Sequence, residues 1–353
     1  MSKSRERVGG YRGRRTLTDI LRLIAILLGI LVLVVLVGLV FGQRFIVYSD
    51  DGLRLELPFL QQEEPELPEI KPGDINMIER PGSSGASSEE MQPPETPVFV
   101  LSAMELDLAD IQNGTAEEKL NAAGANAVVL EMKDVQGKLH WESQQKLAVD
   151  TQVNGAQANN EILEQWLQGD VYTVAKICCF RDNTIPYQRN NMALRATYGN
   201  WRDELGLRWM NPAGEDTQLY LSSLCRELAE MGFDEILLEC YAFPGLGAQE
   251  AITTQAPQGR ARAVEVFLER VRQEVSEYGS KLSVLVEPGV LSGTETASEM
   301  TGELLKQHAD CLWVDETEAS IGQHLFEEES DRLVCIRERL DGQMEGPQAC
   351  LNS

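Results

Sequence analysis

From Val98 to the C-terminus, apolar runs of strand length alternate with amphipathic runs of helical length. In the helical runs the apolar residues recur every three or four positions, whereas in the shorter runs they alternate or are continuous. The predicted strands are Val98–Met104, Ala127–Asp134, Tyr172–Phe180, Glu235–Phe243, Lys281–Pro288, Cys311–Asp315, and two weaker runs, Arg332–Arg337 and Gln348–Leu351. The predicted helices include Thr115–Ala123, Asn160–Gln168, Asp216–Met231, Arg260–Tyr278 and Ala297–His308.

This repeated alternation of strands and helices predicts a parallel sheet. Eight strands between residues 98 and 353 fit a (β/α)8 barrel in number and in length. The alternative is a doubly wound sheet, but no Gly-x-Gly-x-x-Gly loop follows the first predicted strand. The predicted fold is therefore an α/β TIM-like barrel formed by residues 98–353.

The N-terminal part of the chain has a different pattern. The twenty residues 23–42 contain no charge and are rich in Leu, Val and Ile, which matches the roughly 30 Å hydrocarbon core of a bilayer. Most of the flanking positive charge lies in residues 1–22, which predicts a cytoplasmic N-terminus and an extracellular C-terminal domain. The alternative is a cleaved signal peptide, but such peptides have a shorter apolar region that ends at small residues. We expect a single-pass transmembrane helix over residues 23–42, in contact with the lipid bilayer.

Two further segments separate this helix from the barrel. Residues 43–60 are predicted to form a juxtamembrane β-hairpin, because two alternating runs flank the turn Ser49-Asp50-Asp51-Gly52. Residues 61–97 are rich in Pro, Glu, Ser and Gly. This composition cannot bury a core and predicts a flexible acidic linker.

Charge and cysteine content narrow the possible partners. Residues 1–44 carry a net charge of +6, so the rest of the chain carries −31 of the total of −25. An acidic body of this kind repels nucleic acid, which excludes nucleic acid as a partner. The seven cysteines contain no Cys-x-x-Cys pair and the three histidines are scattered. The sequence therefore predicts neither a metal site nor a cofactor.

Charged side chains occur near the carboxyl ends of several predicted strands, which is where barrel enzymes carry their active sites. Period-two alternation predicts which of these side chains face the interior of the barrel. They are Glu131 and Lys133 in the second strand, Lys176 in the third, Glu239 in the fourth, Glu287 in the fifth and Asp315 in the sixth. Three aromatic residues, Trp201, Trp209 and Tyr241, would supply flat surfaces for sugar rings, although such residues more often belong to the core.

Two carboxylates on neighbouring strands are the usual requirement for hydrolysis of a glycosidic bond. One protonates the leaving oxygen, and the other attacks the sugar or activates water. Glu239 and Glu287 meet this description, with lysines nearby to keep one of them ionised. The alternative interpretation is that Glu131–Lys133 and Glu239–Lys176 are ion pairs lining the barrel without any chemistry.

Five segments resemble a bacterial family named as putative glycoside hydrolases, whose members are exported TIM-barrel proteins of uncharacterised substrate. The segments, in order, are Val98–Ala103, Gly124–Gly137, Val174–Asp182, Trp209–Pro212 and Gly232–Pro244. The resemblance covers roughly residues 97–316 and implies a TIM-barrel fold, export from the cytoplasm and activity on glycosidic bonds.

The chain departs from the family at several of these positions. The family's fourth strand typically reads Phe-Asp-Glu-Ile-x-x-Asp-Tyr-x-Arg-Phe-Pro, and here Glu239, Cys240 and Ala242 replace its second Asp, its Tyr and its Arg. In addition, Lys176 stands where an Arg is usual and Glu131 where an Asp is usual. Because an Asp-to-Glu change displaces a carboxylate by one methylene, the resemblance implies the fold more strongly than the activity.

The sequence thus predicts a membrane-anchored, extracytoplasmic barrel that hydrolyses a polysaccharide or cell-envelope glycan through Glu239 and Glu287. The other predicted site residues would bind the substrate; they are Glu131, Lys133, Lys176, Tyr241, Asp315 and Trp209. The alternative function is a catalytically inactive barrel that binds glycan or scaffolds the cell surface.

Overall fold

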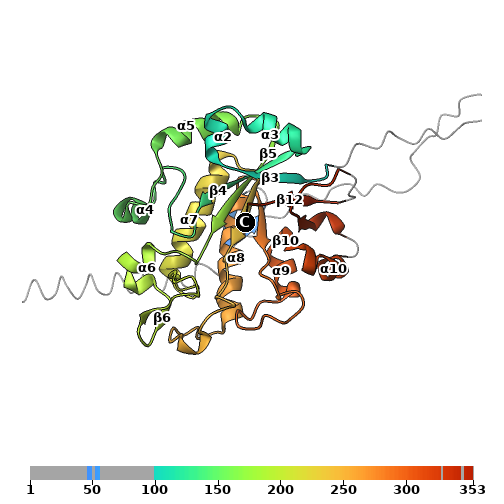
Figure 1. Ribbon diagram of the computed structural model, residues 1–353. Coiled ribbons are helices and arrows are strands. Elements are labelled where there is room, and N and C mark those ends of the chain that lie inside the picture. The colour runs from blue at the N-terminus through green and yellow to red at the C-terminus, as the bar shows by residue number, and fades with distance from the viewer. Residues whose placement is uncertain (1–45, 50–51, 56–98, 327–328, 343–345, 353) are drawn as a thin grey trace, which may run out of the picture. The chain divides into compact units, whose positions relative to one another are not determined.

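The computed structural model describes residues 46–49, 52–55, 99–326, 329–342 and 346–352 (Figure 1). The chain divides into two compact units, Met1–Met91 and Gln92–Ser353. In the first unit, β1 (Ile46–Ser49) pairs antiparallel with β2 (Gly52–Leu55), so the predicted hairpin forms. The predicted membrane helix and linker lie outside the described residues. Within the described ranges, no helix combines the length and the apolar character needed to cross a bilayer.

The second unit is built on a closed barrel of eight strands, in which every pairing is parallel. In order around the barrel the strands are β3 (Ser102–Leu106), β4 (Ala127–Lys133), β5 (Tyr172–Cys178), β8 (Glu235–Glu239), β9 (Lys281–Leu285), β10 (Cys311–Asp315), β11 (Leu333–Ile336) and β12 (Gln348–Cys350). The predicted (β/α)8 barrel is confirmed, including its two weaker strands. Pairing of β12 with β3 closes the sheet and leaves no open edge.

Helices lie outside these strands and cover them (Figure 1). They are α2 (Leu108–Gln112), α3 (Ala116–Ala123), α4 (Lys146–Thr151), α5 (Gln157–Trp166), α6 (Ile185–Gln188), α7 (Glu215–Met231), α8 (Arg260–Ser276), α9 (Gly302–His308) and α10 (Glu316–Leu325). Short 3-10 turns occur at Asn190–Met192, Gln249–Ala251 and Ser330–Arg332. The long connection between β5 and α7 also contains a two-stranded ribbon, β6 (Arg195–Ala196) and β7 (Gly199–Asn200).

Helix α7 illustrates how the sequence produces these outer helices. Leu221, Leu224 and Leu228 recur at helical spacing and are fully buried against the barrel. The helix ends at Gly232, which adopts the left-handed conformation with φ of +113° and donates its N–H to the Ala229 carbonyl. A residue with a side chain would be strained there, so this glycine ends the helix and directs the chain into β8.

Two apolar layers stabilise the domain. The larger lies between the strands and the helices, and the smaller fills the barrel interior with residues such as Val129, Leu237 and Trp313. At the amino-terminal end of the barrel, the buried Glu235 carboxylate accepts hydrogen bonds from Trp313 Nε1 and Tyr172 Oη, both at 2.9 Å. Burial raises the pKa of Glu235. The two hydrogen bonds satisfy this buried group at the amino-terminal end of the barrel. The opposite end carries the remaining inward-facing charges.

One predicted inward residue, Lys133, faces the other way. The pairing of β4 with β5 shifts register between Glu131 and Lys133, so that Glu131 pairs with Lys176 but Lys133 pairs with Ile177. The Ile177 side chain belongs to the layer between the strands and the helices. An irregularity of this kind breaks period-two alternation. The prediction that Glu131 and Lys133 share a face is therefore wrong, and the Glu131–Lys133 ion pair of the alternative interpretation does not form.

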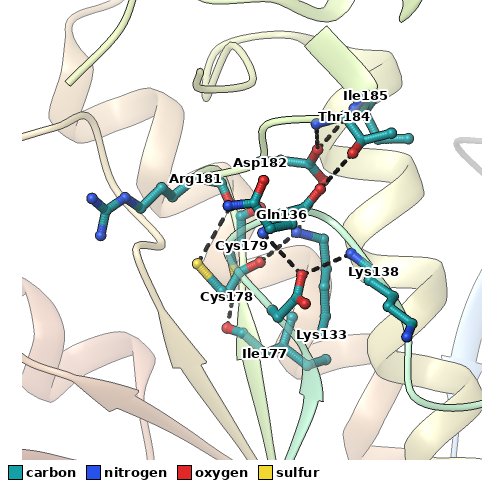
Figure 2. Close-up of polar contacts among 11 residues, drawn as sticks. Lys133, Gln136, Lys138, Ile177, Cys178, Cys179, Arg181, Asp182, Thr184 and Ile185 are labelled. Carbon is teal, nitrogen blue, oxygen red and sulfur yellow. Dashed lines mark hydrogen bonds and ion pairs between the residues drawn. The ribbon is translucent and has the colours of Figure 1, made fainter. Parts of the chain in front are cut away.

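Lys133 instead forms a buried ion pair with Asp182, just after β5 (Figure 2). Lys133 Nζ lies 3.0 Å from Asp182 Oδ2 and also donates to the Cys178 carbonyl at 2.7 Å. Asp182 Oδ1 accepts the backbone N–H groups of Thr184 and Ile185. Both charged side chains are 0% exposed. Burial alone would lower the pKa of Lys133, but the Asp182 charge outweighs it and raises that pKa, so the lysine stays charged.

Gly137 makes this ion pair possible. Its φ is +84°, and a Cβ atom there would overlap the Asp182 carboxylate. We expect Gly137→Ala to lower the free energy of unfolding by about 3–5 kcal/mol, because it displaces one partner of a buried pair and also strains the backbone. The measurement is urea unfolding followed by tryptophan fluorescence, since all five tryptophans lie in the barrel unit.

The matched control is Gly114→Ala. Gly114 has a φ of +71° but no atom within 4 Å of its Cβ position, so it should lose only about 1–2 kcal/mol from backbone strain. Equal losses in the two variants would show that contact with Asp182 contributes nothing.

Candidate active site at the carboxyl ends of the strands

Glu239 and Glu287 come from neighbouring strands and point to the same side of the sheet. Glu239 is the last residue of β8, and Glu287 lies two residues beyond the end of β9, which pairs with β8. Each lies two positions after a residue of the barrel interior, Leu237 and Leu285 respectively. Period-two alternation therefore carries both carboxylates to the carboxyl-terminal mouth of the barrel, as predicted.

A cavity of about 270 Å³ opens beside Glu287. Its wall is formed by the segments that follow β5, β8 and β9, including Arg181, Trp209 and Cys240. Glu239 is not part of this wall, but it immediately precedes Cys240, and its charge acts on Glu287. Another cavity, of about 290 Å³, is lined by residues of α7, α8 and the loop before α8. That one lies on the outer helices, whereas barrel chemistry occurs at the strand ends.

The carboxyl group of Glu287 has an unusual affinity for its proton. Burial raises its pKa to about 7, and the nearby negative charges of Glu239 and Glu295 act in the same direction. The Arg181 charge and a hydrogen bond with the Cys240 thiol oppose this rise without cancelling it. Near neutral pH a large fraction of Glu287 therefore remains protonated, which is the state that a proton donor needs.

Lys176, from β5, supplies positive charge to the mouth of the barrel. Its Nζ lies 2.5 Å from Glu105 Oε1 and 3.7 Å from Glu131 Oε1. Burial alone would lower the pKa of Lys176, but attraction to Glu105, Glu239 and Glu131 outweighs it and raises that pKa. The direct partners of Lys176 are therefore Glu105 and Glu131, and Glu239 acts on it through space. The alternative ion pair Glu239–Lys176 does not form as a direct contact.

Glu131 lies in the same environment as Lys176. Burial raises its pKa, the positive charge of Lys176 lowers it, and the Glu105 charge raises it again, with a net increase. Glu131 is partly exposed and lies 3.7 Å from Lys176 Nζ, so the structure places it at the mouth of the barrel.

Glu105 is a site residue that the sequence reasoning missed. It is buried, pairs with Lys176, and accepts the Asn352 backbone N–H at 2.8 Å. The predicted first strand ended at Met104, whereas β3 extends to Leu106. Alternation from Leu101 and Ala103 would have identified Glu105 as the next inward residue had that strand been extended.

The chain turns sharply after Glu239. Cys240 has a φ of +49°, which is the left-handed region that non-glycine residues rarely adopt. The backbone is held there by Cys179 N–H donating to the Glu239 carbonyl at 2.7 Å and Phe180 N–H donating to the Cys240 carbonyl at 3.0 Å. This turn ends β8 earlier than the predicted Phe243, and it places the Cys240 side chain at the cavity.

The three predicted aromatic residues lie in different surroundings, and Trp201 is fully buried in the core. Trp209 lines the cavity, and its Nε1 donates to Asp203 Oδ2 at 3.2 Å. Tyr241 is only 1% exposed and belongs to the core layer between the strands and the helices. The Tyr241 ring is therefore a packing element, which was the more common role noted for such residues, and it offers no open face to a sugar.

Asp315 caps a helix. Its Oδ1 accepts the backbone N–H groups of Thr317 and Glu318 and the Thr317 hydroxyl, which satisfies the first turn of α10. These bonds are those of an N-cap carboxylate. The structure therefore gives Asp315 a local structural role, and it brings together a smaller set at the mouth than was predicted: Glu131, Lys176, Glu239, Glu287 and Trp209.

Loop residues complete the site. Arg181 Nε lies 2.7 Å from Asp203 Oδ2, and both line the cavity with Glu204 and Glu295. Figure 2 shows the Arg181 side chain extending away from the Lys133–Asp182 pair, as expected for consecutive residues of an extended segment. Asp203, Glu204 and Glu295 lie in long connections without periodic patterns, so no sequence signal identified them. In the part of the chain that the structure describes, no group of His, Cys, Asp or Glu is arranged to hold a metal ion.

Comparison with solved structures finds many similar chains, including the following two. A hypothetical protein from Ruminiclostridium thermocellum ATCC 27405 is 21% identical, with coverage of 51% of this chain and 96% of that one, at a TM-score of 0.45. The PgaB (BpsB) glycoside hydrolase domain from Bordetella bronchiseptica is 13% identical, with coverage of 67% and 84% and a TM-score of 0.51. At 13% identity, the likeness to the Bordetella bronchiseptica domain shows a shared fold and nothing more. A comparison with curated proteins finds no match.

The family comparison is more specific. The model described as "Putative glycosyl hydrolase domain" matches residues 113–312, which is more than half of the chain and lies within the region where the sequence resembles such a family. The matched region contains Glu131, Lys176, Glu239 and Glu287. This chain therefore belongs to the putative glycosyl hydrolase domain family.

Proposed function

We propose that this barrel hydrolyses glycosidic bonds in a polysaccharide or cell-envelope glycan, with Glu287 as the proton donor and Glu239 as the nucleophile or base. The observation that carries the proposal is the pair of carboxylates on neighbouring strands, one of which has its pKa raised to about 7. Membership of a glycosyl hydrolase family supports the same reaction class.

The environments of the two carboxylates support different roles. Glu287 borders the cavity, and burial together with the Glu239 charge raises its pKa to about 7. Glu239 does not line the cavity, and its charge acts on Lys176. Glycosidases need one carboxyl group to protonate the leaving oxygen and a second carboxylate to attack the sugar or activate water. Glu287 borders the cavity with a raised pKa, whereas Glu239 lies outside the wall near Lys176, and this difference supports one role for each residue.

The proposal extends to the location of the domain. A membrane helix over residues 23–42 with a cytoplasmic N-terminus would place the barrel outside the cell, joined by residues 61–97. A linker of that length and composition would let the barrel reach glycans near the membrane.

Substitution of each carboxylate tests the assignment. In the full chain, we expect Glu287→Gln to lower kcat on a glycan by about 10²–10⁴-fold, because the leaving oxygen is no longer protonated. The same variant should retain activity to within about tenfold on 2,4-dinitrophenyl glycosides, whose leaving group needs no proton. Glu239→Gln should abolish turnover of both substrates. The measurement is product release across a panel of glycans and aryl glycosides.

The control for these variants is Glu230→Gln, at an exposed position of α7, which should behave as the parent protein. Hydrolysis by Glu239→Gln at the parental rate would overturn the assignment. Retention of a glycan by the parent protein without any turnover would favour the glycan-binding alternative.

The raised pKa of Glu287 also predicts a pH dependence of stability. Between about pH 4.5 and 7 the folded protein keeps a proton that the unfolded chain releases, so increasing pH favours unfolding. We expect the free energy of unfolding of the parent to fall by about 2 kcal/mol relative to Glu287→Gln over this window, after allowance for partial exposure. Urea unfolding at a series of pH values measures this difference. A constant difference between the two proteins would show that the Glu287 pKa is not raised.

The proposed topology has its own test. With the full chain expressed in its own host, protease added to intact cells should remove the barrel and leave residues 1–22 protected. Protection of the barrel until the cells are lysed would contradict the extracellular location, and recovery of the full chain in the soluble fraction would contradict the anchor.

A further inference from the structure

The charge lining the cavity beside Glu287 is strongly unbalanced. Four carboxylates border it, namely Asp203, Glu204, Glu287 and Glu295, against a single cation, Arg181. Arg181 is already paired with Asp203, with its Nε 2.7 Å from Oδ2, and Trp209 Nε1 donates to the same oxygen. The positive charge of Arg181 is therefore already compensated by Asp203 in the wall of the cavity.

Among the described residues that line the cavity, no second cation balances Glu204 and Glu295. Glu295 accepts the backbone N–H groups of Ala297 and Ser298, which fix its position without neutralising its charge. Glu204 is exposed and makes no ion pair or hydrogen bond with any residue that the structure describes. Two carboxylates from different loops thus face one small space.

The volume and shape of this space suit one or two sugar rings. About 270 Å³ lies near the lower limit for small-molecule sites. The Trp209 side chain forms part of the wall, which provides an apolar surface beside the acidic groups. A ligand here would have polar hydroxyls, one apolar face and, to match the lining, a positive charge.

We propose that the glycan cleaved at this site contains amino sugars with free amines, so that a protonated amine of the substrate lies against Glu204 and Glu295. This inference rests on the proposed hydrolase function and specifies its substrate class. An ammonium group attached to a sugar ring gains Coulombic attraction from both carboxylates. An N-acetylated ring loses that charge, and uronic acids or sulfated sugars would be repelled by the lining.

The experiment uses matched oligosaccharide pairs that differ only in N-acetylation. We take β-1,4-glucosamine, β-1,6-glucosamine and α-1,4-galactosamine oligomers, each in amine and in N-acetyl form, and measure binding to the full chain by calorimetry and cleavage by product release. In at least one linkage the amine form should bind about tenfold more tightly or better, and the preference should shrink at high salt.

A pair of variants separates the site from the general acidity of the protein. Glu204→Gln and Glu230→Gln each remove one unit of negative charge from an exposed position, so both change the net charge of the protein by the same amount. Only Glu204 borders the cavity. We expect Glu204→Gln to lower the amine preference by roughly three- to tenfold, while Glu230→Gln leaves it unchanged.

The outcomes distinguish this inference from the proposed function. Equal or weaker binding of the amine form in all three linkages would overturn the amino-sugar proposal, and so would an equal effect of the two variants. Cleavage of N-acetylated or neutral glycans without preference would retain the hydrolase and reject the substrate class. Amine preference that depends on Glu204, but without any cleavage, would retain the ligand class and reject the hydrolase.

Discussion

The mouth of this barrel depends on a positive charge at Lys176. Parallel strands end at a common rim, so carboxylates at the ends of β3, β4 and β8 are brought together whether or not their charges are compatible. Partly desolvated like charges repel, and one of them would take up a proton unless a cation compensates. The Lys176 ammonium pairs with Glu105 and Glu131 and attracts Glu239. Glu287, which borders the cavity, makes no ion pair with Lys176, and burial raises its pKa to about 7.

A second lysine, on the other side of the sheet, keeps the adjoining segment in place. Lys133 and Asp182 are buried together; Lys133 also donates to the Cys178 carbonyl, and Asp182 Oδ1 accepts backbone N–H groups. Removing one partner of such a pair leaves an uncompensated buried charge. Arg181 precedes Asp182, so the fixed position of Asp182 also determines where the Arg181 side chain enters the cavity wall (Figure 2). The buried pair therefore positions a residue of the site without touching the site itself.

The fold and part of the site follow from the sequence for a physical reason. Strand–helix alternation and period-two parity are properties of regular structure, so they identified the eight strands and placed Glu131, Lys176, Glu239 and Glu287 at the mouth. Errors arose where regularity stops. The register shift after Glu131 turns the Lys133 side chain to the outer face of the sheet, contrary to the prediction. The predicted first strand ended at Met104, before Glu105, so Glu105 was not identified as an inward residue.

Other parts of the site depend on contacts that no pattern encodes. A carboxylate at the end of a strand can face the barrel or cap the next helix. Asp315 caps α10, because its Oδ1 accepts backbone N–H groups of that helix. Asp203, Glu204 and Glu295 come from long loops, whose course is set by tertiary contacts such as the acceptance of backbone N–H groups by Glu295. These residues became recognisable only once the loops that follow β5, β8 and β9 lay side by side around one cavity.

Two positions at which this chain departs from the family it resembles lie at that cavity. Cys240 and Ala242 line it and stand where the family typically has Tyr and Arg. Both are much smaller than the residues they replace, so space that larger side chains would occupy is left open beside Glu287. The replacement of Arg by Ala242 also leaves Arg181 as the cation among the cavity-lining residues that the structure describes. These two departures therefore affect both the size and the charge of one cavity, and both effects are consistent with the amino-sugar substrate that we propose.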